Sequence, residues 1–193
     1  MTRRTNRWTQ TVIALAAACG MVLGTAGAAG AAPGGGAFSA QARSVGLSGA
    51  EARELQSAVT AEIARAGGTQ VGLNRIERPG ATVLLPLPGE AYAHNLDAPA
   101  SRTAAGRLMA ESCPRLNFCQ YSNINFQGMV EQRSACTDYN NYLVYDGSWK
   151  NNQSRGTVTY MRDKGGAIRY STPGAPSEDN VAPWNWVGSI KVC

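Results

Sequence analysis

The chain has 193 residues, of which 18 are Lys or Arg, 13 are Asp or Glu, five are Cys and one is His. Three arginines and no acidic residue lie in the first 32 positions, so 15 basic and 13 acidic groups remain and the formal charge falls from +5 to +2. A charge this small, without clustered Lys and Arg, argues against a nucleic-acid partner, and a single histidine leaves little room for a catalytic triad or a His-rich metal site.

The first 31 residues have the pattern of a secretory signal peptide. Arginines lead into an apolar region at 11–23, and two small-x-small motifs, at 26–28 and 29–31, are candidate cleavage sites. We therefore expect a secreted, extracellular protein. Beyond residue 32 no apolar run approaches the ~20 residues that a membrane span requires. We expect no membrane association after the signal peptide is removed.

Export changes the interpretation of the cysteines. Cys19 lies in the signal peptide, and the four that remain are Cys113, Cys119, Cys136 and Cys193. An even number of cysteines in an exported chain predicts two disulfides, whereas a zinc site would need short C-x2-C pairs that are absent here. The cysteine count alone leaves three pairings open. All four lie in the last 81 residues, which we expect to form the disulfide-bonded domain.

Residues 32–46 are rich in Gly, Ala and Ser and predict a flexible lead, and residues 47–90 predict a helix followed by a β-hairpin. Ser48 and Glu51 have the spacing of a capping box, in which each side chain bonds to a free amide of the first helical turn. A Gly-Gly pair marks the helix end. An apolar stripe recurs every fourth residue of this helix, at Leu55, Val59 and Ile63.

Two extended runs, 69–76 and 81–87, flank a Pro-Gly turn and predict the hairpin. A helix and a hairpin make a thin core, so we expect this segment to need a partner for stability. Residues 91–112 lack periodicity and predict a linker, in which His94 has no nucleophile partner and is interpreted as solvated. Because exposed linkers are readily cut, the helix-hairpin is either a pro-segment released by cleavage at 95–112 or a second part of the mature protein.

After the linker, short strand-like runs alternate with turn clusters, a pattern that favours an all-β sandwich or barrel. Asp146-Gly147 is one of the turn signals. Alternation over 157–160 predicts a half-buried strand with Val158 and Tyr160 on its apolar face. The runs are 116–121, 128–132, 142–145, 156–162, 167–170 and 186–192.

The sequence Tyr121-x4-Phe126-x-Gly128 matches the aromatic-and-glycine signature of a beta/gamma-crystallin Greek-key motif. Tyr121 would end a strand, Phe126 would fold back against its ring, and Gly128 would supply a backbone angle that other residues avoid. With Cys113-Pro and Cys119 before it, the segment resembles the opening of secreted bacterial metalloproteinase inhibitors of crystallin-like fold.

Later segments resemble a wider group of exported actinobacterial proteins that are grouped with these inhibitors. They include 148–153, 171–175 and 184–193, and the helix-hairpin also resembles the N-terminal part of that group. The resemblance implies a mainly β protein, in which residues 113–193 form a crystallin-like Greek-key sandwich after the small helix and hairpin. The second Greek-key motif is degenerate, because Gly165 stands where its second aromatic belongs. The resemblance also implies the disulfides Cys113–Cys119 and Cys136–Cys193.

The function that the resemblance implies is inhibition of an extracellular peptidase, most directly a metalloprotease, by a monomer without a cofactor. Such an inhibitor needs a rigid exposed loop and no catalytic groups, because a preorganised loop loses little entropy on binding. The inhibitors that the chain resembles carry this loop at a second short-range cysteine pair, which is missing here, so no inhibitory bond is assigned. Turn chemistry indicates two candidate loops, 136–141 and 170–180.

Two alternatives remain open, a purely structural module or one that binds calcium or cell-wall glycan. Asn151 and Asn152 match the first two positions of a crystallin calcium motif, but a cation and a glycine replace its hydroxyl residues, so we interpret both as turn residues. Trp149, Trp184 and Trp186 would form a glycan-stacking surface, and core packing is the competing interpretation. No acid pair or nucleophile motif is evident, and we expect no catalytic residue and no enzyme.

Overall fold

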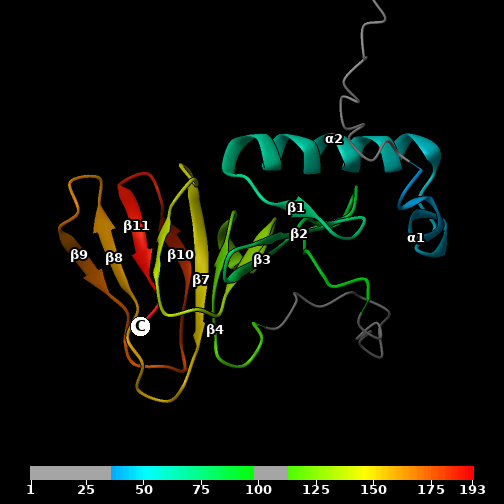
Figure 1. Ribbon diagram of the computed structural model, residues 1–193. Helices are drawn as coiled ribbons and strands as arrows, with labels where there is room; N and C mark the ends of the chain where they lie inside the picture. The colour runs from blue at the N-terminus through cyan, green and yellow to red at the C-terminus, as the bar shows by residue number, and fades with distance from the viewer. Residues whose placement is uncertain (1–35, 98–112) are drawn as a thin grey trace, which may run out of the picture. The chain divides into compact units, whose positions relative to one another are not determined.

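The computed structural model describes residues 36–97 and 113–193, which all lie in one compact unit of the chain. The signal peptide predicted at 1–31, including Cys19, and almost all of the cut region predicted at 95–112 lie outside the described residues. Most of the regular structure is in two antiparallel sheets (Figure 1), so the expected mainly β fold is confirmed. No helix in the described ranges is both long and apolar enough to cross a membrane.

The helices are α1 (Ser39–Ser44), α2 (Gly49–Ala66) and the short 3-10 helix η1 (Ile124–Phe126). The strands are β1 (Thr69–Gln70), β2 (Arg75–Arg78), β3 (Ala81–Leu84), β4 (Asn117–Tyr121), β5 (Val130–Arg133), β6 (Asp138–Asn140), β7 (Asp146–Asn152), β8 (Tyr160–Asp163), β9 (Ile168–Ser171), β10 (Ser177–Pro183) and β11 (Val187–Lys191).

Two sets of four strands, β4 to β7 and β8 to β11, follow the same path through the two sheets. The larger sheet has the order β1-β2-β3-β5-β4-β7-β10 and the smaller one has the order β6-β11-β8-β9. In each set the fourth strand lies beside the first, while the third strand joins the opposite sheet. This exchange of β6 and β10 ties the two sheets together as one sandwich.

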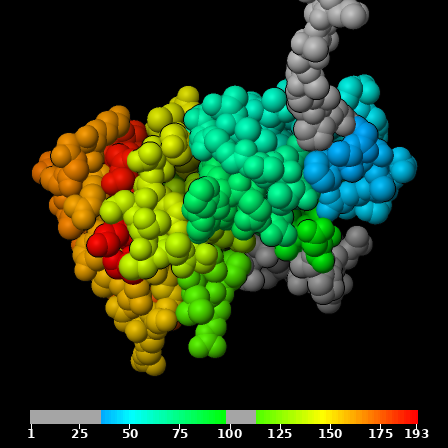
Figure 2. Space-filling view, in the orientation of Figure 1, coloured from blue at the N-terminus to red at the C-terminus, as the bar shows by residue number. Residues whose placement is uncertain are grey.

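The predicted hairpin, β2 and β3, continues the larger sheet instead of standing apart from it. Strand β3 pairs with β5 over four residues, with Leu84 opposite Val130. Tyr92 forms a further parallel bridge with Gly128. Figure 2 shows the surface of the helix-hairpin directly against that of the following strands. The partner that the thin helix-hairpin core was expected to need is therefore the rest of the same chain.

Helix α2 begins and ends where its sequence predicts. The Ser48 amide donates to Glu51 Oε2 at 2.8 Å, and the Glu51 amide donates to Ser48 Oγ at 3.3 Å. The helix ends before Gly67, whose positive φ of 73° is a backbone angle that glycine adopts readily. The predicted stripe is buried at Leu55 and Val59 and packs against the apolar face of the hairpin.

The flexible lead predicted at 32–46 is wrong for its second half, which contains α1. Ala42 of this helix is buried in the apolar cluster under α2. Gln41 Oε1 also accepts a 2.7 Å hydrogen bond from the Leu73 amide of the hairpin. Composition alone missed this helix because its stability comes from these tertiary contacts.

Three strands, β6, β7 and β10, were not predicted. The strand predicted at 142–145 is a loop, and the turn predicted at Asp146-Gly147 is the start of β7. A Cβ on Gly147 would meet Trp184 Nε1 and the Tyr121 carbonyl oxygen, so glycine here permits close packing and not a turn. Strand β10 is an edge strand with mostly exposed polar residues, and it therefore lacks an alternating pattern.

The apolar alternation predicted near β8 is reversed. Thr159 and Met161 are buried, whereas Val158 and Tyr160 are only partly so. The Thr159 hydroxyl donates to Gln153 Oε1 at 2.9 Å, and the Thr159 amide donates to Thr172 Oγ1 at 2.9 Å. Because these hydrogen bonds satisfy its polar atoms, a threonine occupies the buried face.

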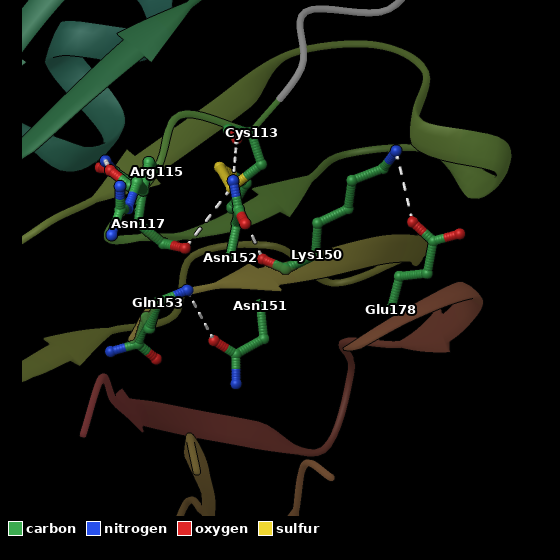
Figure 3. Close-up of a disulfide and its surroundings, with 9 residues drawn as sticks. Cys113, Arg115, Asn117, Lys150, Asn151, Asn152, Gln153 and Glu178 are labelled. Carbon is green, nitrogen blue, oxygen red and sulfur yellow. Dashed lines mark hydrogen bonds and ion pairs between the residues drawn. A yellow bond between two sulfur atoms is a disulfide. The ribbon is translucent and has the colours of Figure 1, made fainter. Parts of the chain in front are cut away.

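Both disulfides that the resemblance implies are present. Cys113 and Cys119 have Cα atoms 5.7 Å apart, and Cys136 and Cys193 have Cα atoms 5.4 Å apart. In Figure 3 the Asn152 side chain lies against the first bridge, where its amide donates to the Cys113 carbonyl at 2.8 Å. The second bridge spans 57 residues and joins the segment before β6 to the last residue of the chain.

Candidate functional site

Residues 141–145, the loop between β6 and β7, carry an unusual concentration of exposed apolar side chains. Tyr142, Val144 and Tyr145 are 40%, 56% and 81% exposed. They are three of the nine large hydrophobic residues that are exposed in the described ranges. Single exposed apolar residues are common, but a cluster of them on one short segment indicates a contact surface.

Asn141 fixes the backbone of this loop from inside. Its Nδ2 lies 2.9 Å from the Leu143 carbonyl oxygen, 3.1 Å from that of Trp184 and 3.0 Å from that of Val187. Its Oδ1 accepts from the Leu143 amide at 3.2 Å. The half-buried Leu143 side chain packs against the core between the sheets, so the loop is anchored while its neighbours remain exposed.

The far end of the loop is also held. The Trp184 amide donates to the Tyr145 carbonyl oxygen at 3.3 Å. Asp146, which follows Tyr145, begins β7. Trp184 is itself fully buried, and its indole nitrogen donates to the Tyr121 carbonyl oxygen at 3.1 Å. Both sides of the exposed segment are therefore attached to the rigid interior.

A buried polar network continues inward from the loop. Gln120 donates to Asn141 Oδ1 at 2.8 Å and accepts from Arg133 Nη2 at 2.6 Å. Arg133 is completely buried, and its Nη2 lies 3.2 Å from Glu131 Oε2. The Arg133 guanidinium also lies 5.2 Å from the centre of the Tyr139 ring, which compensates part of its desolvation. We name this chain of hydrogen bonds and ion pairs the polar seam. It connects Asn141, at the base of the loop, to the buried charges of Arg133 and Glu131.

The same network returns to the loop by way of helix α2. Arg78 lies 3.4 Å from Glu131 Oε2 and 2.7 Å from Glu62 Oε1. Glu62 also pairs with Arg65 at 2.7 Å, and the Arg65 guanidinium lies over the Tyr142 ring, 5.6 Å from its centre. The helix-hairpin thus supports the loop directly, so the candidate site is built from both halves of the chain.

The residues of the predicted fold signature lie together as expected. The rings of Tyr121 and Phe126 meet edge to face, with centroids 5.5 Å apart and planes inclined by 70°. Gly128 has a φ of 76°, and a Cβ there would meet Ser122 Oγ. Lys150 lies 4.1 Å from the centre of the Phe126 ring. This corner is packed and supports β4 rather than forming a ligand site.

The predicted calcium candidates have structural roles. Asn151 donates to the Thr157 carbonyl oxygen at 2.9 Å and accepts from the Gln153 amide at 3.3 Å. Asn152 bonds to Cys113, as described above (Figure 3). Within 36–97 and 113–193 no three His, Cys, Asp or Glu side chains are grouped so that they could hold a metal ion.

The two candidate loops from turn chemistry are loops only in part. In the first of them residues 138–140 are β6, which pairs with β11, and the second contains the end of β9, the connection 172–176 and the start of β10. The candidate segment 141–145, which the sequence analysis did not select, overlaps the first of these loops only at Asn141. Its available signal was the Asn-Asn pair at 140–141, since asparagine commonly ends a strand and bonds to a backbone two residues on.

Other candidates also differ from expectation. Trp149 and Trp184 are buried and Trp186 is half-buried, so these residues form no exposed glycan-stacking surface. His94 is half-buried, with Nδ1 3.2 Å from Glu90 Oε2, and is not a solvated linker residue.

Comparison of the chain with protein-family models, with curated proteins and with solved structures finds no match.

Proposed function

We propose that this protein is a secreted peptidase inhibitor whose binding segment is the loop 141–145, and that its target is an extracellular metalloprotease. The observation that carries the proposal is an apolar, exposed segment held rigidly at both ends. Peptidases bind extended chain segments, and a loop that is already fixed in shape loses little entropy when it enters a cleft. The loop does not need a catalytic group, and we propose that the protein is not an enzyme.

An inhibitor must also survive attack on its own binding segment. A cut within 142–145 would separate Cys136 from Cys193 in the chain, but the disulfide between them would keep the two pieces covalently joined. For a cut after Leu143, Asn141 would hold the Leu143 carbonyl oxygen on one side, and the Trp184 amide would hold the Tyr145 carbonyl oxygen on the other. The cleaved ends would stay in place, which favours persistent occupation of the cleft over product release.

The kind of peptidase follows from the side chains and from the resemblance. Tyr142, Leu143, Val144 and Tyr145 include no Lys or Arg, so the loop does not suit a peptidase whose pocket selects a basic residue. The chain resembles secreted inhibitors of metalloproteinases in its cysteine and aromatic pattern. These two points favour a metalloprotease that accepts large apolar side chains.

We also propose that residues 113–193 form a crystallin-like Greek-key sandwich. The return of β7 beside β4 and of β11 beside β8 supports it, since a Greek key places its fourth strand beside its first. The corner formed by Tyr121 and Phe126 supports it as well. In this sandwich the third strand of the first motif, β6, leads directly into the proposed binding loop.

The test is a titration of the oxidised chain without its first 31 residues. A thermolysin-type metalloprotease is the target enzyme and a trypsin-type serine protease is the control. We expect metalloprotease activity to fall in proportion to added protein and to reach zero near equimolar amounts. Val144→Asp should abolish this effect, because a charge would enter an apolar pocket. Full metalloprotease activity at excess wild-type protein would refute the proposal.

A further inference from the structure

A cavity that does not include the loop 141–145 opens between the two sheets and has a volume of about 440 Å³. We name it the aromatic cleft. Its walls include three aromatic rings and three charged side chains, which come from β7, β8, β9 and β10 and from the turn before β11. They are Trp149, Tyr170 and Trp186, and Asp163, Arg169 and Asp179.

The rings of Trp149 and Tyr170 meet at an angle and do not stack flat upon each other. The centroids of Trp149 and Tyr170 are 6.3 Å apart, and their planes are inclined by 57°. Trp149 is buried and forms the floor, whereas Tyr170 is 38% exposed and Trp186 is half-buried at the rim. Aromatic faces carry a negative quadrupole, so adjoining inclined rings form a favourable environment for a cation.

The charges of the cleft are not balanced. Asp163 accepts from the Gly165 amide at 2.9 Å and the Ala167 amide at 3.0 Å, and its other oxygen lies 3.4 Å from Arg169. Asp179 accepts only from the Val181 amide, at 3.0 Å, and forms no ion pair within the described ranges. The cleft therefore keeps one negative charge for which the surrounding side chains provide no cation.

Asp179 also faces the aromatic wall. Burial, and after it the Asp179 carboxylate, raise the pKa of the Tyr170 hydroxyl above its ordinary value. Tyr170 therefore lies close enough to the Asp179 carboxylate to interact with it, and both residues line the cleft. The uncompensated carboxylate and the aromatic residues line the same cavity.

We propose that the aromatic cleft binds a small organic cation that bears an alkylated or quaternary ammonium group. The partly exposed rings of Tyr170 and Trp186 would contact its methyl groups, and Asp179 would balance its charge. A saccharide fits less well, because it needs several free donors and acceptors and Asp163 is already occupied by two amides and Arg169. This inference does not depend on peptidase inhibition.

The test uses choline and its uncharged carbon isostere, dimethylbutanol, as probes of the chain without its first 31 residues. Binding is followed by tryptophan fluorescence and by NMR shifts of the indole protons, since two tryptophans line the cleft. We expect saturable binding of choline and binding of the isostere that is weaker by about tenfold. Equal affinities for the two probes, or no binding of choline to the folded protein, would overturn the proposal.

Variants locate the site. Asp179→Asn should weaken choline binding by about tenfold, since it removes the uncompensated charge. Glu178→Gln is the matched control on the same strand, because Glu178 pairs with Lys150 outside the cleft and its loss should leave choline affinity unchanged. Thermal unfolding of both variants verifies that they are folded. An unchanged affinity in folded Asp179→Asn, or binding of a chitin oligosaccharide in place of choline, would contradict the assignment.

Discussion

The side-chain amide of Asn141 lies 3.0 Å from the carbonyl oxygen of Val187, 46 residues later in the chain. The contact joins the end of β6 to the start of β11, and the same carboxamide holds the backbone of the exposed loop. A single short side chain therefore couples the shape of the proposed binding segment to the closing strand of the sandwich. The coupling makes the loop rigid without a disulfide inside it.

Asn141→Ala should both destabilise the protein and weaken inhibition. It leaves the carbonyl oxygens of Trp184 and Val187 without this donor and frees the loop, and we expect a loss of about 2–3 kcal/mol in the free energy of unfolding. Denaturant unfolding and peptidase titration measure the two effects. Asn180→Ala is the control, since Asn180 is exposed and has a single 3.3 Å side-chain bond. Equal behaviour of the two variants would show that Asn141 does not organise the loop.

Tyr145→Ala separates binding from stability. Tyr145 is 81% exposed, so its truncation should change the free energy of unfolding by less than about 0.5 kcal/mol. Inhibition should weaken by about tenfold or more, because large aromatic side chains dominate many interfaces. Ile168→Ala, at a 49% exposed position in β9, should leave inhibition unchanged. Inhibition constants of the two variants decide whether the loop makes the contact.

The buried charges of the seam can be tested with a double-mutant cycle. Glu131→Gln leaves the fully buried Arg133 without its carboxylate, and we expect a loss of about 3–5 kcal/mol. Arg133→Met in the same chain removes the unpaired charge and should restore much of the stability. Urea unfolding of the single and double variants measures this coupling. Additive losses would show that the two side chains do not compensate each other.

Tyr139 should make the protein sensitive to alkaline pH. Burial is the main cause that raises the pKa of its hydroxyl above the ordinary value of 10.0. A raised pKa in the folded state gives stability that is complete below the unfolded pKa and is lost as pH rises through the folded value. We therefore expect the free energy of unfolding to fall above pH ~10. Tyr139→Phe should show a smaller fall, and identical pH profiles would exclude Tyr139 as the cause.

Cleavage of the chain between residues 97 and 113 should not release the helix-hairpin. Strand β3 pairs with β5, and the Tyr139 hydroxyl lies 2.9 Å from the Gly80 carbonyl oxygen, so the two pieces share a sheet and a core. Size-exclusion chromatography of the cut protein should give one peak that contains both pieces. Separation into a free, folded 113–193 piece would support the pro-segment hypothesis instead.

The sequence predicts those parts of the fold that local chemistry determines. The capping box of α2 needs only Ser48 and Glu51, and the Tyr121–Phe126 corner is formed within six residues. Strand β7 is different. Its buried Ser148 is satisfied by a bond to the Asn123 carbonyl oxygen and by one from the Phe126 amide, at 2.8 Å each. Because these partners from a distant turn allow a serine to be buried, β7 lacks the alternation of apolar and polar residues that predicts a strand.

The candidate site could be predicted only in part for the same reason. The apolar run 142–145 was evident, but its pattern is equally typical of a strand. What makes it a loop is Asn141, whose acceptors include residues 43 and 46 positions away. The aromatic cleft likewise depends on the exchange of β10 between sheets, which brings Asp179 near Tyr170.

The proposed binding segment is tested most directly by locating where a peptidase cuts this protein. After long incubation with an equimolar amount of metalloprotease, mass spectrometry should find a single nick within 142–145. The unreduced protein should be heavier by one water, and reduction should release two pieces because Cys136–Cys193 joins them. The nicked protein should still inhibit. Cleavage that begins elsewhere, or loss of inhibition once this loop is cut, would contradict the assignment of residues 141–145 as the binding segment.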